Sequence, residues 1–305
     1  MSKKRKQRYQ AKQTGRSFPS VQTLFRYSVI DFETRQMIDK ASESLGPEIW
    51  ERDRDAVERI ERAKTADELL DLAVAATGMA EPTWYRRVRQ FGGDIVPKMT
   101  LRLKGSRDIA DHHEQTLVRE HLIAALRWRG TLGANALQEA FADLDEYAQS
   151  LAAVVLGVLH ARSSADLIWD LFQRTKQKPE SYFIGALWAL IDFGDARAAD
   201  ALAELLDLER GYEEMFGFIA RAGDERVIIP MVGLMVRGNK TEKDQVGYVF
   251  AAIAQRLGRE RFLATLMRDM PAEQREAGER TMDTLFQIPM DAIREYFELY
   301  YRGVA

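Results

Sequence analysis

The four histidines are the side chains best suited to hold a metal ion in this sequence. His113, Glu120 and His121 are spaced i, i+7 and i+8, so a helix would carry all three on one face. Two imidazoles and a carboxylate are common ligands of transition metals. On a straight helix, however, ligands two turns apart lie about 10 Å from each other, too far for one ion. Leu117 also occupies the position that the second histidine of an HExxH motif would need. We therefore expect surface histidines and no metal site.

Other patterns associated with catalysis are missing from the sequence. It has no nucleophile elbow, P-loop or dinucleotide fingerprint. It also has no cysteine, which excludes a thiolate nucleophile and a disulfide and suits a reducing cytoplasm. Carboxylates are abundant, but they fall on the solvated faces of predicted helices, whereas paired acids for general acid–base catalysis need a pocket. The sequence therefore favours a non-enzymatic cytoplasmic protein without a cofactor.

A basic cluster between residues 84 and 107 is a candidate binding region. Its seven arginines and lysines are accompanied by a single acid, Asp94, so its net charge is +6. Phosphate contacts would attract a nucleic acid to this cluster, with Trp84 or Tyr85 available to stack on a base. In the alternative interpretation, which we favour, Trp84 belongs to the core and the arginines solvate the other face of its helix. The candidate binding residues are Trp84, Tyr85, Arg86, Arg87, Arg89, Lys98, Arg102 and Lys104.

Residues 1–30 carry eight lysines and arginines and no acid, while the other 275 residues carry a net charge of −11. A block of like charge without apolar periodicity is typical of a disordered, solvated tail. Such a tail either keeps the chain soluble or contacts a polyanion. The longest apolar runs, 151-LAAVVLGVL-159 and 183-FIGALWALI-191, reach about half of the ~18 residues that cross a bilayer, so we expect no membrane partner.

The motif Gly-Asp-x-Arg occurs twice, 29 residues apart, each time between two apolar segments. A glycine can take the left-handed conformation that closes a helix. The aspartate after it can accept hydrogen bonds from the free amides of the next helix. Both copies therefore predict a sharp joint between two helices. The joint residues are Gly194, Asp195, Arg197, Gly223, Asp224 and Arg226.

Similar joints recur along the chain, because Gly133, Ser163 and Gly258 each fall 30 to 35 residues from a neighbouring joint. A period of roughly 30 residues, built from a helix, a turn and a second helix, is the signature of a solenoid. A chain of 305 residues is also long for one closed core. We therefore expect an all-α superhelical solenoid of stacked antiparallel helix pairs. The second helix of each pair, including the one with Lys98 and Arg102, should line the inner, concave surface.

The paired segments resemble HEAT repeats of the short type found in phycocyanobilin-lyase-like repeat proteins. The Gly-Asp-x-Arg turns within residues 181–237 carry this resemblance, which extends by pattern only to residues 81–175 and 239–302. The resemblance implies a ladder between the turns of neighbouring units. In this ladder Asp195 would pair with Arg226.

By the same resemblance, Asp224 and Arg197 would each pair with a residue of their own neighbouring units. The implied organisation is a basic tail (1–30), an N-terminal helical cap region (31–80) and a HEAT-like repeat solenoid (81–305). The last helix pair would close the solenoid as a cap. Ile293, Phe297 and Tyr300 should face inward in that cap.

The function that we expect is a non-enzymatic binding scaffold that holds a protein partner in a concave groove. The first alternative is a nucleic-acid-binding protein, akin to helical-repeat alkylpurine DNA glycosylases, that uses the basic tail and the cluster at residues 84–107. The second alternative, a bilin lyase or chaperone, is implied by the resemblance alone. These repeats serve adaptors, lyases and DNA-repair enzymes, so the motif predicts the fold and not the chemistry.

Overall fold

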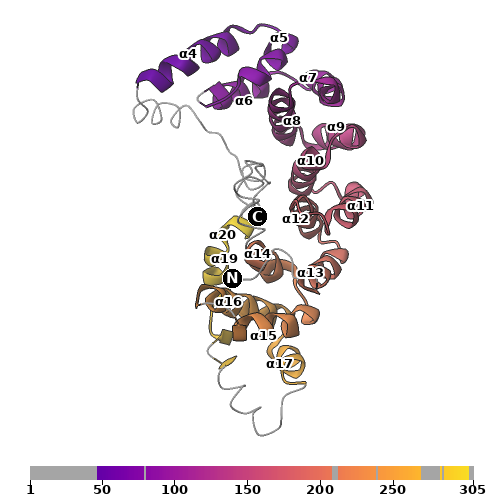
Figure 1. Cartoon of the computed structure of the whole chain (residues 1–305), viewed down its shortest axis with the longest axis vertical. Helices are drawn as coiled ribbons and strands as arrows, with labels where there is room; N and C mark the ends of the chain where they lie inside the picture. Colours follow the sequence, from indigo (N-terminus) through magenta and orange to yellow (C-terminus); the bar gives the residue numbers. More distant parts are fainter. Residues whose placement is uncertain are drawn as a thin grey trace.

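The computed structural model describes residues 47–78, 80–207, 212–237, 240–268, 282–283 and 285–301. Every regular element in this part of the chain is a helix, so the all-α fold class is confirmed (Figure 1). None of the described helices combines the length with the apolar composition that crossing a bilayer requires. The basic tail of residues 1–30 lies outside the described residues.

The longer helices alternate between two layers. The inner layer consists of α4 (Pro47–Arg62), α6 (Ala80–Gln90), α8 (His112–Leu126), α10 (Glu146–Val158), α12 (Phe183–Phe193), α14 (Tyr212–Ala222) and α16 (Lys240–Leu257). The outer layer consists of α5 (Ala66–Asp71), α7 (Ile95–Gly105), α9 (Gly130–Ala140), α11 (Ala165–Thr175), α13 (Arg197–Asp207), α15 (Ile228–Arg237) and α17 (Arg259–Leu266). Two short helices follow, α19 (Met290–Tyr296) and α20 (Glu298–Tyr301).

Each helix of the inner layer packs against the next helix of the same layer, from α4 to α16. In Figure 1 the helices form a curved row, with α8, α10, α12 and α14 on its inner side and α7, α9, α11 and α13 on its outer side. The first helix of each pair therefore lies inside. The prediction that the second helices line the inner surface is wrong, and so is the predicted inner position of Lys98 and Arg102, which belong to α7.

The distribution of apolar residues explains this arrangement. Helices α10 and α12 are buried over almost their whole length, and a helix that is apolar on all sides needs cover from every direction. Helix α13 instead buries a stripe that includes Ala198, Ala201 and Leu205, and it leaves Asp200 exposed. Such an amphipathic helix fits the outer layer, because its polar face remains in solvent.

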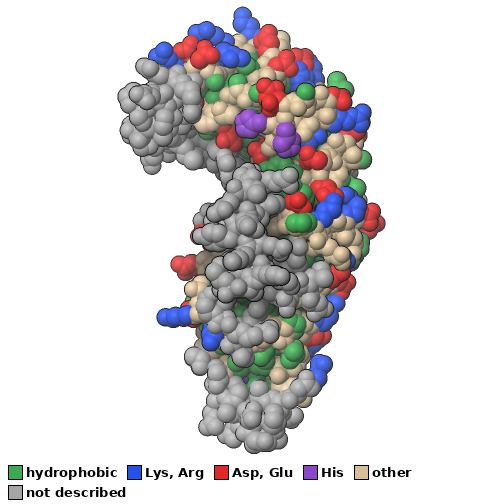
Figure 2. Space-filling model, viewed as in Figure 1, with side chains coloured by type: hydrophobic (Ala, Val, Ile, Leu, Met, Phe, Trp, Pro, Cys, Tyr) green, Lys and Arg blue, Asp and Glu red, His purple; other side chains and the backbone are tan. Residues whose placement is uncertain are grey.

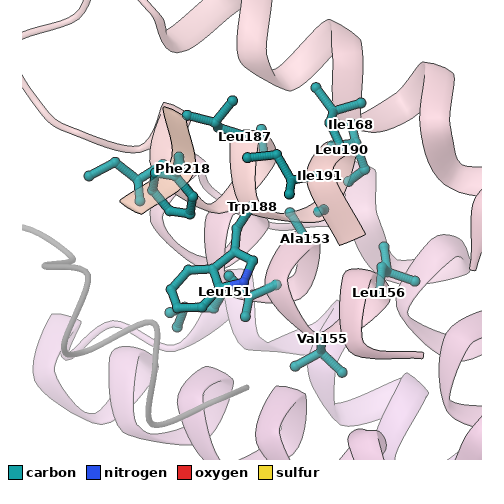
Figure 3. Close-up of a cluster of buried hydrophobic side chains, with 14 of the residues drawn as sticks. Leu151, Ala153, Val155, Leu156, Ile168, Leu187, Trp188, Leu190, Ile191 and Phe218 are labelled. Atoms are coloured by element: carbon teal, nitrogen blue, oxygen red, sulfur yellow. The ribbon is translucent and has the colours of Figure 1, made fainter. Parts of the chain in front are cut away.

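Small residues allow the inner helices to approach closely. A Cβ on Gly185 of α12 would lie 2.1 Å from the carbonyl oxygen of Ser150 on α10. A Cβ on Gly157 of α10 would lie 2.9 Å from Cα of Ala189. Figure 3 shows Trp188 among the apolar side chains that α10, α11, α12 and α14 contribute beside this contact. The core is therefore continuous from one inner helix to the next.

The two Gly-Asp-x-Arg joints differ in conformation. Gly194 has a φ of +66°, as predicted, and its N–H donates to the carbonyl oxygen of Ile191 at 3.0 Å. Asp195 Oδ1 accepts a 2.9 Å hydrogen bond from the amide of Arg197, which is also as predicted. Gly223 is not in the left-handed region. It needs to be glycine for a different reason, because a Cβ there would lie 2.7 Å from the carbonyl oxygen of Ile219.

The C-terminal segment, defined here as residues 289–301, does not extend the row as a further helix pair. Helix α19 packs against α16, and α20 packs against α14, so the segment runs back along the inner side (Figure 1). Ile293 and Phe297 are buried, as predicted for inward-facing residues. The predicted cap pairs this segment with residues 272–287, most of which lie outside the described residues.

Candidate functional site

The aromatic residues of the basic cluster belong to the core. The indole Nε1 of Trp84 donates a 2.8 Å hydrogen bond to the carbonyl oxygen of Leu69, and the side chain is fully buried. Tyr85 is also buried, with its ring edge-on to the rings of Trp84 and Trp128, both at 5.3 Å. Neither ring is open to a base, so the candidate stacking role of Trp84 and Tyr85 is wrong, and the favoured interpretation, in which Trp84 belongs to the core, is confirmed.

The basic side chains on α6 already have partners in this structure. Arg86 pairs with Glu61, and Arg87 donates to the carbonyl oxygen of Ala63 at 2.7 Å. The guanidinium of Arg89 lies 5.4 Å from the centre of the Trp128 ring. These side chains tie α6 to its neighbours.

The basic side chains on α7 lie on the outer side of the row and are paired as well. Lys98 bonds to Asp67, and Arg102 bonds to Asp67 at 2.9 Å and to Asp71 at 2.8 Å. Lys104 lies 3.2 Å from Glu139. The hydrogen bond from Lys98, and to a lesser extent the one from Arg102, lowers the pKa of Asp67. Figure 2 shows side chains of both charge signs interspersed on the described part of the visible face. The basic side chains of the cluster therefore join successive helices through ion pairs.

The joint arginines make a ladder, but with other partners than the resemblance implies. Arg197 bonds to Asp195 of its own turn at 2.7 Å and to Asp166 of the preceding unit at 2.8 Å. Arg226 bonds in the same way to Asp224 at 2.6 Å and to Asp200 of the preceding unit. The predicted pair of Asp195 with Arg226 is wrong. The carboxylate of Asp195 is used by its own turn, so the next arginine binds the first-turn acid of α13.

The histidines do not converge on one another. His112 and His113 are exposed at the start of α8, whereas His121 is buried, with its ring 5.5 Å from that of Trp84. The prediction of a surface position is therefore wrong for His121, because it faces the core. Within the described part of the chain, no three histidine or acidic side chains are close enough to hold a metal ion.

A groove on the outer side lies between α7 and α9. Leu101 is 72% exposed and Leu132 is 55% exposed, and both line a hollow of about 470 Å³ that the Lys104–Glu139 pair borders. Exposed leucines that share a hollow can contact a partner.

The inner side has a second candidate site, and a helix already occupies it. The ring of Tyr300 on α20 lies against Gly217 of α14, where a Cβ would come 2.1 Å from the ring. Phe218 meets the same ring edge-on at 4.9 Å, and Trp188 lies nearly parallel to it at 6.2 Å. We call the surface formed by Trp188, Gly217, Phe218 and Arg221 the Tyr300 seat.

Arg221 fixes the backbone of the same helix. Its guanidinium donates to the carbonyl oxygen of Tyr300 at 2.7 Å and to Asp192 at 2.8 Å, and it lies 5.9 Å from the centre of the Tyr301 ring. Both members of the ion pair are buried. Burial raises the pKa of Asp192, although Arg221 opposes this shift. A buried charge is costly without a partner of opposite charge, so the ion pair with Asp192 holds Arg221 in the position from which it contacts α20.

The C-terminal segment also borders an open hollow of about 620 Å³ beside the joint between α12 and α13. Arg221, Arg294 and Tyr301 line one part of it, and Gly194, Asp195 and Ala198 line another. The size falls within the range of small-molecule sites. Because Arg294 and Tyr301 belong to the C-terminal segment, this segment forms part of the wall of the hollow.

Gly217, Arg221 and Tyr301 were not predicted as site residues from the sequence. One signal is present, because Gly217 interrupts 212-YEEMFGFIARA-222, and a glycine inside a helix often marks a close approach of another element. The partner cannot be inferred from spacing, since Arg221 and Tyr300 are 79 residues apart.

Comparisons of the chain with protein-family models, with curated proteins and with solved structures find no match.

Proposed function

We propose that the protein is a non-enzymatic binding scaffold, a HEAT-like superhelical solenoid of helix pairs that holds a helical segment of a protein partner on its inner side. The observation that carries this proposal is the Tyr300 seat, where the inner layer already binds one short helix through an aromatic ring, a glycine and a buried arginine. Grooves lined in this way are a recurrent means of recognising amphipathic helices. The lack of cysteine supports a cytoplasmic location as part of the proposal.

The spacing of the ion pairs between helices supports the repeat character of the scaffold. Asp67–Lys98, Asp71–Arg102 and Asp166–Arg197 each join residues 31 positions apart. Similar pairs join residues 35 and 36 positions apart, as in Lys104–Glu139 and Arg107–Asp143. Exposed pairs of this kind add little to stability, so we assign them the role of fixing how one unit packs on the next.

The nucleic-acid alternative draws less support from the described residues, because the aromatic rings of the basic cluster are buried and its charges have partners. No observation favours a bilin-related activity. The nucleic-acid alternative would place the ligand at the basic tail and residues 84–107, away from the Tyr300 seat, so a test of the scaffold needs to locate the partner on the surface.

Site-specific photocrosslinking in the native cell provides that test. Tyr182, a partly exposed residue next to the N-terminal end of α12, is replaced by a photoreactive phenylalanine analogue. Leu101 in the outer groove is the matched position, because it is exposed and belongs to the other layer. We expect one protein to crosslink at Tyr182 and to bind the purified chain. Adducts at Leu101 alone, or no protein adduct at either position, would contradict the inner-side scaffold.

A further inference from the structure

We propose, on the basis of the function above, that the Tyr300 seat is the partner's own binding site. The partner presents a helix with aromatic side chains at positions i, i+3 and i+4, the spacing of Phe297, Tyr300 and Tyr301. The C-terminal segment occupies the seat in the free protein and is displaced when the partner binds.

The seat is shaped for a ring. Only a glycine at position 217 leaves room for the Tyr300 side chain, because any Cβ would lie 2.1 Å from it. The ring of Phe218 is perpendicular to this ring and that of Trp188 is nearly parallel to it, geometries that stabilise aromatic pairs beyond area burial. A glycine in the middle of α14 weakens that helix relative to alanine, and the contact with the Tyr300 ring offsets this loss.

The seat also recognises a helix end. The last four carbonyl groups of a helix lack partners within the helix, and the carbonyl of Tyr300 is one of them. Arg221 supplies the missing donor at 2.7 Å, and Asp192 holds its guanidinium from the other side. None of these contacts requires that the helix be connected to the chain, so a helix from another protein can make them.

The C-terminal segment consists of short helices that a longer helix can displace. Helix α19 has seven residues and α20 has four, and isolated helices shorter than about 12–15 residues are marginal in water. The segment therefore owes its order to the surface that it covers. Tyr296 stacks on Tyr248 of α16 at 4.1 Å, but its side chain is still 41% exposed. A longer partner helix with the same ring spacing would cover more of α14 and α16.

The test uses full-length chains and a fluorescein-labelled peptide with the sequence of residues 287–305. Its affinity is measured by fluorescence anisotropy for the wild-type chain and for the Tyr300→Ala chain. In the wild type, the tethered segment competes at an effective concentration on the order of 1 mM. We therefore expect the peptide to bind the Tyr300→Ala chain at least about tenfold more tightly. Equal affinity for the two chains would overturn the proposal.

Two controls define the site. A peptide in which the tyrosine equivalent to Tyr300 is alanine should lose the gain in affinity. A Gly217→Ala substitution added to the Tyr300→Ala chain should also abolish the gain, because the new Cβ fills the seat. Circular dichroism and cooperative melting show whether each chain is folded. Retention of binding in either control would also overturn the proposal.

A second measurement covers the case in which Tyr300→Ala does not fold. In the wild-type chain, excess peptide should speed up hydrogen exchange in residues 290–301, since the segment is released; no change contradicts displacement. If the peptide tests fail but a protein crosslinks at Tyr182, the scaffold function is still supported. Only the proposal that the partner binds the Tyr300 seat is then contradicted. If the peptide binds but no protein crosslinks at Tyr182, the Tyr300 seat only holds the chain's own C-terminal segment. That result contradicts the scaffold function.

Discussion

The ring of Tyr300 occupies the space in which the Cβ of any residue other than glycine at position 217 would lie, with a separation of 2.1 Å to the nearest ring atom. This contact joins the C-terminal segment to α14. Because Gly217 lies inside a helix and is buried against another helix, its requirement for glycine is one of space and not of backbone conformation.

Gly217→Ala is therefore expected to loosen the C-terminal segment. Alanine favours the helix by about 1 kcal/mol, whereas overpacking against the ring costs about 1–3 kcal/mol, so the net effect is a loss of stability that is concentrated in the segment. Hydrogen exchange should become faster in residues 290–301 and stay unchanged in α4 to α10. The matched control is Gly247→Ala on α16, where a Cβ would make an ordinary 3.4 Å contact with Leu285. An equal response of both variants would contradict the role of the Tyr300 ring.

The contact between α10 and α12 predicts a second glycine effect. Gly185→Ala would place a Cβ 2.1 Å from the carbonyl oxygen of Ser150, which belongs to a backbone that cannot rotate away. We expect the free energy of unfolding to fall by about 1–3 kcal/mol, measured by urea denaturation. Gly105→Ala at the end of α7 is the control, because no atom lies within 4 Å of the new Cβ. It should be neutral or slightly stabilising, and a loss of stability there would contradict this explanation.

The joint between α12 and α13 predicts a pH-dependent effect. The hydrogen bond from Arg197 is the main cause that lowers the pKa of Asp195 below its ordinary value of 3.8. Stability from this carboxylate is therefore present above pH 3.8 and is lost as the pH falls through the lower, folded-state pKa. Asp195→Asn keeps a capping side chain but removes the charge, so it should cost about 1 kcal/mol at pH 7. This difference from the wild type should shrink below about pH 4 in urea titrations.

Asp166→Asn is the matched control for that joint. Asp166 also bonds to Arg197, at 2.8 Å, but its side chain is 95% exposed. Exposed pairs of this kind contribute little, so its replacement should change stability by less than about 0.5 kcal/mol at any pH. If the two substitutions had the same effect, the carboxylate of Asp195 in the turn would not be the source of the stability.

Features that are local in sequence could be predicted. The left-handed Gly194 and the carboxylate cap of Asp195 follow from residue types and their order, and both are confirmed. The capping box of Thr65 and Glu68 is another feature of this local kind. Each of these features needs only neighbours within one turn. The all-α class follows from a series of such features.

Features that depend on distant packing could not be predicted. The partner of Arg226 depends on how one unit packs on the next, and it is Asp200 of the preceding unit in place of Asp195. The burial of His121 depends on the neighbouring rings of Trp84 and Tyr85, which lie more than 30 residues earlier in the chain. The Tyr300 seat is the extreme case, since its arginine and its tyrosine are 79 residues apart.

The basic cluster predicts the response to nucleic acid. Arg86 and Arg87 have acidic or carbonyl partners, and Arg89 lies over Trp128, so replacing all three with glutamine should leave the affinity for a short DNA duplex unchanged at low salt. If the three arginines contacted phosphates, the slope of log affinity against log salt would fall by about 2.7. Deletion of residues 1–30, which removes eight positive charges, is the matched comparison and should abolish any duplex binding. A change in the slope of log affinity against log salt in the triple variant would show that the arginines of the basic cluster contact nucleic acid.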